Sequence, residues 1–425
     1  MAAGTALTGI SGILAAGCGP AVNTGVKKTL EFWAFADTRL AWQKKAFELY
    51  KQQKNPDFDI DWVILPYGQM HDKILITSQA GSGGPDIADI EISAFSRFIK
   101  GDVIFAELTP RLTEMGVLDK LFRPSATDPW SWKGKIYGMG NELNTCLLSY
   151  RWDLWQKAGV KTPIATWAEF AQEAERYHKD TGKYLIDFPY SDWSSWWMMS
   201  LQKKSGFFND QGLPILNSPT SVDVLKFQQQ ALASWSRTRP DGQAYNTALS
   251  AGDITSLIGP SWDFSGGIQE NNPNTKGKWH LQPIPAWEPG GSRSATWGGT
   301  GVCVLKTSSS VAEAVDFVTF EHTTPEALLN DFKIRQVWPT FKPALNDPLL
   351  STPLEFFDHQ RVGEVIKEVS PEINKWYNSP YWPEVTDAMV RTAITPAVQN
   401  PKMSTEEALN AAQNESMRII NFETA

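Results

Sequence analysis

Apolar side chains recur with two different periods along the first hundred residues, and the two periods alternate. Residues 28–36 (KTLEFWAFA), 58–65 and 87–92 are short runs that either alternate apolar and polar positions or are largely apolar, which predicts strands. Residues 40–53 and 72–80 place apolar side chains on one helical face, which predicts amphipathic helices. Strands that alternate with helices predict an α/β fold with a parallel sheet, whose ligand crevice lies outside the carboxyl ends of the strands.

The residues that follow two of these strands are therefore candidates for ligand contact. They are Asp37, Thr38 and Arg39 after the first strand, and Glu91 and Ser93 after the third. Exposed residues at such positions also serve as ordinary helix caps and surface charges. The sequence pattern alone does not distinguish ligand contact from these structural roles.

The stretch 132–170 changes its period three times, which marks it as a crossing point between two parts of the chain. Residues 136–150 mix leucines with short polar side chains in an extended pattern and predict a strand. From position 151 the apolar residues follow a helical spacing that stops at Gly159. Residues 166–169 (TWAE) have the form of a capping box and open a further predicted helix over 167–177.

The length and composition of the chain limit the number of lobes and the kind of ligand that can be expected. The 425 residues are enough for two hydrophobic cores, because a single core stops growing near roughly 250–300 residues, so we expect two lobes. The formal net charge is −8 with acidic and basic residues interspersed, and no basic stripe favours a nucleic-acid partner. The chain has 19 Trp against 21 Phe and 10 Tyr, although Leu, Ile and Phe fill a core more economically. Some of the indoles are therefore expected to contact a ligand.

A cluster of indoles follows a short predicted strand near the middle of the chain. Trp193, Trp196 and Trp197 are spaced i, i+3 and i+4, so on a helix they share one face. That face either packs into the core or forms a stacking wall beside the polar residues Tyr190 and Asp192. A sugar ring presents C–H groups on its faces and hydroxyls at its edge, so it pairs with an aromatic plane and planar hydrogen-bonding groups. This combination of residues favours a neutral oligosaccharide as ligand.

Other chemistry has little support in the sequence. Cys146 and Cys303 lie in apolar strand-like runs and are expected to be buried free thiols, with a disulfide between them as the alternative. No C-x-x-C pair and no metal-ligand spacing occurs, so we expect neither a metal nor a cofactor. The Gly-rich loop 81–86 precedes a strand and lacks the Lys-Ser/Thr of a phosphate-binding loop, which favours a tight turn.

The N-terminal residues carry a targeting pattern. Residues 7–17 are small and apolar but too short to span a bilayer, which needs ~20 residues, and they lead into LAAGC, which ends at Cys18. This ending resembles the lipobox of bacterial lipoproteins, which implies a signal peptide over residues 1–18, lipidation of Cys18 and a tether over residues 19–27. The alternative is a disordered tail of small residues that ends in an unmodified Cys.

Several short motifs resemble the extracellular solute-binding proteins of carbohydrate ABC importers, the maltose-binding-protein-like family. The motifs are KGKIYG at 133–138, YRWD at 150–153, TWAE at 166–169, GPDI at 84–87, FAELTP at 105–110 and GDITSLIGPSWDFSG at 252–266. YRWD stands where the family has Tyr-Asn-x-Asp, and the resemblance covers residues 28–420.

The resemblance implies a two-lobed α/β fold of class II with the ligand in the cleft between the lobes. It places the N-lobe at residues 28–142 and 294–335 and the C-lobe at residues 143–293 and 336–425. The implied function is capture of a neutral mono- or oligosaccharide and its delivery to the transmembrane permease subunits of an ABC transporter. The resemblance also implies an extracytoplasmic, lipid-anchored monomer without enzyme activity.

The resemblance further nominates ligand contacts in the later part of the chain. Trp262 falls near the family's stacking Trp, Gly298 and Gly299 belong to a predicted return strand, and Trp382 and Arg391 lie in segments that resemble the family's C-terminal helices. The full candidate set is Trp33, Asp37, Thr38, Glu91, Ser93, Glu142, Asn144, Tyr190, Asp192, Trp193, Trp196, Trp262, Asp263, Trp297, Gly298, Gly299, Trp382 and Arg391.

Two other functions stay open at this point. A glycoside hydrolase would use the same Trp-lined groove with two carboxylates that face each other across one bond, and its candidates are Glu91, Glu142 and Asp192. A lipoprotein adhesin would bind glycan without transport. Release of reducing sugar would favour the hydrolase, whereas neighbouring permease genes would favour the transport receptor.

Overall fold

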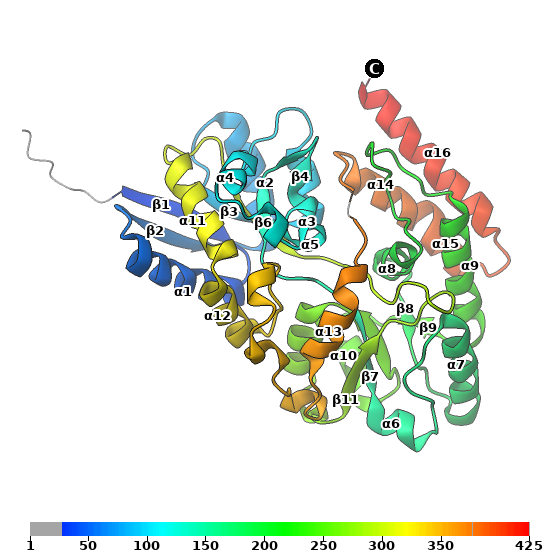
Figure 1. Ribbon diagram of the computed structural model, residues 1–425. Coiled ribbons are helices and arrows are strands. Elements are labelled where there is room, and N and C mark those ends of the chain that lie inside the picture. The colour runs from blue at the N-terminus through cyan, green and yellow to red at the C-terminus, as the bar shows by residue number, and fades with distance from the viewer. Residues whose placement is uncertain (1–27, 376, 425) are drawn as a thin grey trace, which may run out of the picture.

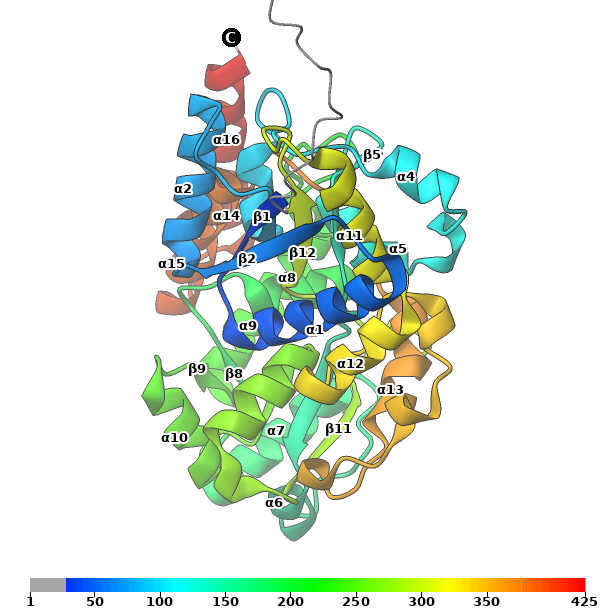
Figure 2. The same ribbon diagram turned by 90° about the vertical axis from the view of Figure 1, so that its left-hand side faces the viewer.

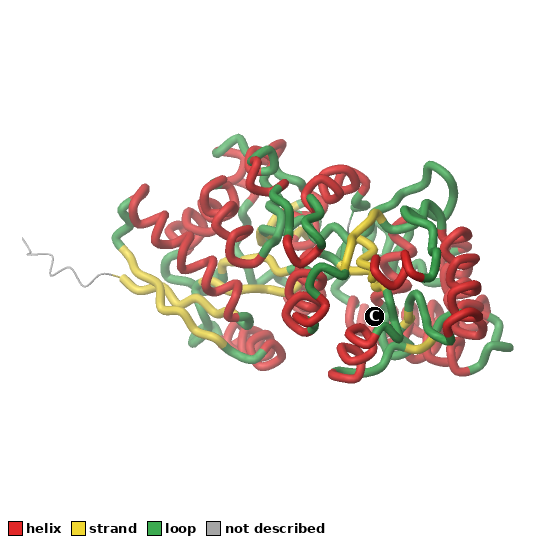
Figure 3. Tube along the Cα trace, turned by 90° about the horizontal axis from the view of Figure 1, so that it is seen from below, coloured by secondary structure: helices red, strands yellow, loops and turns green. Residues whose placement is uncertain are grey.

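The computed structural model describes residues 28–375 and 377–424, which form two lobes (Figure 1). We call the half around the five-stranded sheet the N-lobe and the half around the three-stranded sheet the C-lobe. Seen from below, the two lobes lie side by side with helices around their strands (Figure 3). Cys18, the predicted signal peptide and the predicted tether lie outside the described residues.

The N-lobe sheet has the strand order β2-β1-β3-β12-β6. Its strands are β1 (Lys28–Ala34), β2 (Phe58–Ile64), β3 (Ile87–Glu91), β6 (Gly138–Gly140) and β12 (Thr300–Val304). β1 runs parallel to β2 and β3, as the alternating pattern predicts, whereas β12 runs antiparallel to β3 and β6. A strand from late in the chain therefore completes a sheet that begins at the N-terminus.

Helices cover both faces of this sheet, and Figure 2 looks onto α1, α11 and α12. The N-lobe helices are α1 (Asp37–Lys54), α2 (Tyr67–Ala80), α3 (Ile92–Phe95), α4 (Thr109–Glu114), α5 (Arg123–Ala126), α11 (Val311–Thr323) and α12 (Pro325–Arg335). Phe32 and Ala34 of β1 pack with α1 and α11, whereas Trp33 packs with α2 on the opposite face. Because both faces of β1 are buried, its apolar residues are continuous rather than alternating.

The C-lobe sheet has β7 (Leu147–Arg151) at its centre, antiparallel to β10 (Ser256–Gly259) and to β11 (Trp279–Pro283). β8 (Asp187–Phe188) and β9 (Arg237–Thr238) form a parallel pair, and a parallel bridge from Tyr184 to Ile254 places the β8 segment beside β10. The carboxyl ends of β8, β9 and β10 therefore point in the same direction.

The C-lobe helices surround these strands, and α16 runs along the outer side of the lobe in Figure 1. They are α6 (Trp152–Lys157), α7 (Trp167–Thr181), α8 (Ser194–Gln202), α9 (Pro219–Ser234), α10 (Gln243–Ala251), the π-helix η4 (Asp263–Glu270), α13 (Val362–Val369), α14 (Trp382–Met389), α15 (Thr395–Gln399) and α16 (Thr405–Thr424). The predicted capping box is confirmed, because Thr166 Oγ1 accepts from Glu169 N and Glu169 Oε2 accepts from Thr166 N, both at 3.2 Å.

One predicted strand was wrong in extent. The stretch 136–150 is divided between β6 in one sheet and β7 in the other, and residues 141–146 between them are irregular. The division falls where the backbone passes between the lobes, at a point where Asn144 has a φ of 50°. A left-handed residue ends strand geometry, and no periodic pattern records it.

Cys146 and Cys303 are both buried free thiols, which confirms the expectation from their apolar surroundings. Among the described residues, no helix combines the length and the apolar character needed to cross a bilayer.

Candidate functional site

Three chain segments connect the two lobes in the described structure, and they lie side by side. The first is 141–146, the second is 295–299, and the third is 336–340. Backbone hydrogen bonds of 2.9 Å join the first segment to each of the other two. Isolated bridges, rather than a continuous ladder, hold this group together. We call these the hinge segments, because few backbone hydrogen bonds oppose their bending.

Two adjacent glycines on the second hinge segment allow two side chains to approach the backbone closely. A Cβ at Gly298, where φ is 63°, would lie 2.9 Å from the Trp262 ring. A Cβ at Gly299, where φ is 120°, would collide with Nδ2 of Asn144. Glycine adopts these dihedral angles at low cost and leaves this room. The rings of Trp262 and Trp297 then meet with centroids 4.9 Å apart at 50°, and we call this half-buried pair the aromatic corner.

Buried polar atoms surround the aromatic corner without hydrogen-bond partners among the described residues. They are Nε1 of Trp262, Oδ1 of Asn144 and Oε1 of Gln336. Buried polar atoms in folded proteins are nearly always paired, since an unpaired one costs about 1–3 kcal/mol. One donor and two acceptors beside an aromatic surface are therefore available to a polar ligand.

A hollow of about 210 Å³ opens beside the aromatic corner. Its lining includes Thr38 from the start of α1, Trp262, Ser265 and Gln269 from η4, and Gln336 from the third hinge segment. Thr38 is exposed, as is its neighbour Asp37. The hollow therefore joins a strand end of the N-lobe to the aromatic side of the C-lobe, as the rule of carboxyl strand ends predicts.

A second hollow of about 380 Å³ lies between other parts of the two lobes. Its lining includes Tyr67, Ser93 and Arg97 from the N-lobe, and Trp193, Trp382 and Asp387 from the C-lobe. Trp193 and Trp382 meet edge to face with centroids 5.8 Å apart. The structure thus brings Ser93, Trp193 and Trp382 together, although they lie far apart in the sequence.

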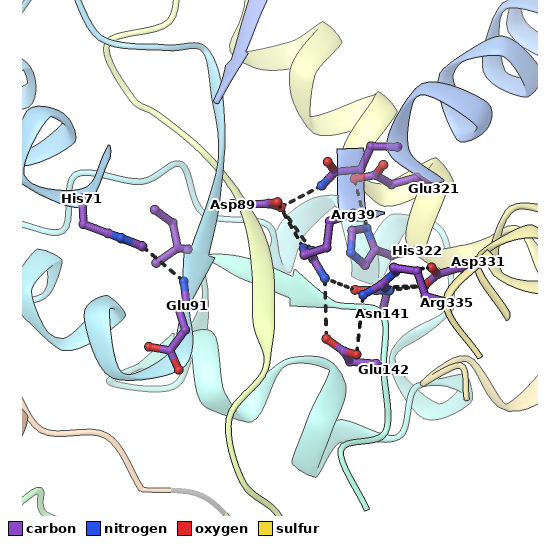
Figure 4. A network of polar contacts seen from close by, with 12 residues as sticks. Arg39, His71, Asp89, Glu91, Asn141, Glu142, Glu321, His322, Asp331 and Arg335 are labelled. Carbon is purple, nitrogen blue, oxygen red and sulfur yellow. Dashed lines mark hydrogen bonds and ion pairs between the residues drawn. The ribbon is translucent and has the colours of Figure 1, made fainter. Parts of the chain in front are cut away.

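Glu91 ends β3 and caps α3 beside the second hollow. Its Oε2 accepts hydrogen bonds from Ser93 N at 2.8 Å and from the Tyr67 hydroxyl at 3.1 Å. Burial raises the pKa of Glu91, while these hydrogen bonds lower it. His71 stands behind it, and its Nε2 faces Glu91 N at 3.4 Å (Figure 4). Burial lowers the pKa of His71.

A buried ionic network lies at the N-lobe end of the hinge segments (Figure 4). Arg39, which is 4% exposed, donates two hydrogen bonds of 3.1 Å to Asp89 and one of 3.0 Å to Asn141. Glu142 lies 3.6 Å from Arg39 and 3.8 Å from Arg335. Burial raises the pKa of Glu142, and the two guanidinium groups lower it. Glu142, a predicted ligand contact, is thus engaged by cations of the protein itself.

Three other predicted contacts line neither hollow. Trp33 and Trp196 are each 1% exposed and pack in the core, because helices cover both faces of β1 and α8 turns Trp196 inward. Arg391 is exposed and pairs with Asp387 at 3.3 Å and with Glu415 of α16 at 2.6 Å. One of these partners, Asp387, lines the second hollow, so Arg391 lies at the edge of that hollow without lining it.

Tyr190 and Asp192 follow β8 and are half-buried. Asp192 Oδ1 accepts a hydrogen bond of 2.7 Å from Ser194 N at the start of α8. The carbonyl oxygen of Tyr190 accepts one of 2.7 Å from Thr395 Oγ1. These contacts fix the loop that carries Trp193 to the second hollow.

Sequence reasoning missed Tyr67, Gln336 and a polar pair formed by Asp187 and Arg239. Tyr67 follows β2, so the rule of carboxyl strand ends could have found it. The same rule applies to Arg239, which follows β9, but not to Asp187, which begins β8. Gln336 carries no such signal, because its position depends on a left-handed turn, with a φ of 55°, after α12.

Comparison with known proteins gives the family. The family described as bacterial extracellular solute-binding protein matches residues 43–357. An arabinooligosaccharide-binding protein of Bacillus subtilis is 29% identical over 420 residues, which is 95% of each chain. A protein of the same name from Halalkalibacterium halodurans is 28% identical over 400 residues, covering 90% of this chain and 88% of the relative.

Solved structures show the same fold at low sequence identity. The sugar-binding protein MalE of Xanthomonas citri has a TM-score of 0.76 at 18% identity, covering 94% of this chain and 100% of that one. The galacto-N-biose-/lacto-N-biose I-binding protein of Bifidobacterium longum has a TM-score of 0.75 at 18% identity, covering 93% and 98%. These structures confirm the predicted fold class. Because the family match spans most of its length, the chain belongs to the bacterial extracellular solute-binding proteins, the group that its sequence motifs resemble.

Proposed function

We propose that the protein is the substrate-binding component of an ABC importer and captures a neutral oligosaccharide in the cleft between its lobes. The observation that carries this proposal is the aromatic corner of Trp262 and Trp297, with unpaired buried atoms of Trp262, Asn144 and Gln336 beside it. Aromatic planes contact the C–H faces of a sugar, and buried donors and acceptors bind its hydroxyls. The names of the two curated relatives support an oligosaccharide as the ligand.

The two hollows favour a ligand of more than one ring. One holds about 210 Å³ beside the aromatic corner, and the other holds about 380 Å³ beside Trp193 and Trp382. Each hollow draws lining residues from both lobes, so a ligand in either one touches both. An oligosaccharide that reaches both hollows would gain two separate aromatic contacts.

Titration calorimetry against a panel of arabino-, xylo-, malto- and galacto-oligosaccharides tests the proposal. Trp262→Ala should weaken the tightest interaction by ~10-fold or more, from the loss of roughly 1.5–3 kcal/mol of aromatic contact. Arg361→Ala is the control, because Arg361 is exposed, donates to the carbonyl oxygen of Ser351 and lines neither hollow, and it should bind like the wild type. If no sugar binds, or if Trp262→Ala binds within twofold of the wild type, the proposal fails.

We propose that the protein has no hydrolase activity. The three candidate carboxylates are each engaged separately: Glu91 caps α3, Glu142 lies between two arginines, and Asp192 holds the first turn of α8. A glycosidase instead needs one carboxylic acid and one free carboxylate across a shared bond. Reducing-sugar release from the same oligosaccharide panel would contradict this part of the proposal.

We also propose that the lobes close on the ligand as rigid bodies about the hinge segments. The proposed boundaries are residues 28–142 and 294–335 for the N-lobe and residues 143–293 and 336–425 for the C-lobe. A ligand that binds both lobes favours the closed form by its differential affinity. Small-angle scattering of the monomer should therefore show compaction when the tightest oligosaccharide is added, and an unchanged radius of gyration would contradict closure.

Membrane attachment through Cys18 is part of the proposal, together with delivery to transmembrane permease subunits. The lipobox resemblance supports it, and the family is extracellular. One lipidated N-terminus with two or more acyl chains suffices for stable anchoring. Cys18→Ser should move the protein from the detergent phase to the aqueous phase after expression in a bacterial host, and unchanged partition would refute the anchor.

A further inference from the structure

Four polar side chains gather in the C-lobe, near the short strand β8 and the carboxyl ends of β9 and β10. Asp187 begins the short strand β8, Arg239 follows β9, Asp263 opens η4 after β10, and Tyr245 lies on α10. Arg239 Nε donates to Asp187 Oδ2 at 2.5 Å, and the guanidinium lies 4.9 Å from the centroid of the Tyr245 ring. Asp263 directly follows Trp262, which lines the hollow at the aromatic corner. We call these four residues the ionic wall.

Most of the hydrogen-bonding capacity of the ionic wall is unused by the protein. Oδ1 of Asp187 is buried without a hydrogen bond, and the Tyr245 hydroxyl faces Asp187 without reaching normal hydrogen-bond geometry. Within the described chain, the terminal nitrogens of Arg239 and both carboxylate oxygens of Asp263 likewise make no hydrogen bond. The Asp187 side chain is 0% exposed, whereas that of Arg239 is 24% exposed. A buried acceptor thus lies behind a partly accessible donor.

The chain makes room for the Asp263 carboxylate at two glycines. A Cβ at Gly267 would lie 2.8 Å from Oδ1 of Asp263, and a Cβ at Gly259 would collide with Oδ2. Neither glycine has a positive φ, so the backbone itself does not require glycine at these positions. The space they leave for the carboxylate accounts for both.

We propose that the ionic wall binds two adjacent hydroxyl groups of one sugar ring and thereby selects which ring the C-lobe accepts. This inference rests on the proposed function. One hydroxyl of such a pair accepts from a terminal nitrogen of Arg239 while its neighbour donates to Asp263. A ring with a carboxylate would meet two carboxylates, Asp187 and Asp263, and like charges oppose its binding. A neutral vicinal diol satisfies donor and acceptor together, and charge-assisted hydrogen bonds of this kind are stronger than neutral ones.

The pKa of Asp263 allows a test by pH, because a cluster with only a structural role would leave the pH dependence of sugar affinity unchanged when its residues are substituted. Burial raises its pKa to about 6, Arg239 lowers that pKa, and Asp187 raises it. The other titratable groups near Asp263 are Tyr245 and the buried thiol of Cys146. Because the ionised carboxylate is the stronger acceptor, sugar affinity should fall as the pH drops through about 6. Arg239→Gln should move the midpoint of this fall to higher pH, and Asp187→Asn should move it to lower pH.

Calorimetry at pH 5.0 and pH 7.5, with the tightest sugar of the oligosaccharide panel, tests the inference. Arg239→Gln and Asp187→Asn should each weaken binding about 10- to 100-fold at pH 7.5, the usual range for a lost hydrogen bond to a charged group. Arg239→Lys keeps the charge with fewer directed donors and should recover part of the loss. Arg237→Gln is the matched control, since Arg237 lies over Tyr184 instead and should bind like the wild type.

The affinities, pH profiles and melting temperatures of these variants distinguish a binding surface from a structural cluster. If the wild type binds sugar but Arg239→Gln and Asp187→Asn bind within twofold of it, the ionic wall is not a binding surface. If both variants lose affinity but keep the wild-type pH profile and melt at lower temperature, the cluster is only structural. Tighter binding of a uronate or an amino sugar than of the neutral ring would also overturn the inference. Failure of the wild type to bind any sugar would instead refute the proposed function.

Discussion

Arg39→Met removes the central cation of the ionic network at the hinge and should destabilise the protein strongly. In the native structure, Arg39 makes three hydrogen bonds to Asp89 and Asn141 and an ion pair with Glu142. After the substitution, Asp89 would keep the 2.7 Å hydrogen bond from Gln43 as its remaining side-chain partner. Asp89 is 0% exposed, so water cannot replace the lost guanidinium.

The expected loss is about 3–5 kcal/mol, the usual cost of removing one partner from a buried ion pair. Methionine fills a similar length, so the lost volume contributes little. Urea denaturation followed by circular dichroism measures the change, with attention to separate transitions because a two-lobed protein need not unfold in one step. Arg39→Met combined with Asp89→Leu should recover part of the loss, because it removes the uncompensated buried charge.

Lys45→Met on the same helix is the control. Lys45 pairs with Glu48 at 3.6 Å, but both side chains are mostly exposed, at 58% and 60%. Exposed pairs of this kind contribute little, so no measurable change is expected. A loss of less than about 1 kcal/mol for Arg39→Met, or a double variant no more stable than the single one, would contradict this role of Arg39 in the buried network.

Two further predictions concern stability. Thr166→Ala removes the side-chain half of the capping box of α7 and should cost about 1 kcal/mol in urea denaturation, whereas Thr247→Ala, on the exposed side of α10, should cost less. Burial raises the pKa of Glu321 well above its usual value, so the stability that its neutral form provides is present below about pH 4.5 and is lost as the pH rises. Glu321→Gln should therefore lose less stability than the wild type between pH 5 and pH 8, and parallel profiles for the two proteins would contradict the assignment.

The sequence predicted the elements better than it predicted which side chains would meet. The helical spacing of Trp193, Trp196 and Trp197 indicates a shared face, but the packing of α8 decides that Trp196 and Trp197 are buried while Trp193 reaches a hollow. Burial depends on what covers the face, and the covering residues, such as Phe207 and Trp382, come from elsewhere in the chain. Periodicity holds no information about such partners.

The partners of the charged residue Arg391 also could not be predicted from the sequence. The resemblance placed it at a family position, but its side chain turns toward Glu415, which lies on a different helix. The ionic wall is the converse case, because Asp187 and Arg239 are separated by 52 residues and only the pairing of the short strands β8 and β9 brings them together. Such pairs become visible only once the strand order is known.

The position of β12 within the N-lobe sheet has a consequence for how the protein is made. Thr300 pairs with Glu91 and Gly301 with Gly140, so β12 lies between two strands that are synthesised much earlier. Until residues 300–304 have left the ribosome, one edge of β3 is unpaired and β6 has no sheet to join. Pairing between such distant residues folds slowly, and an apolar edge that waits for its neighbour is prone to aggregation. A fragment that ends before residue 300 should therefore be insoluble, even though it contains most of the N-lobe sequence.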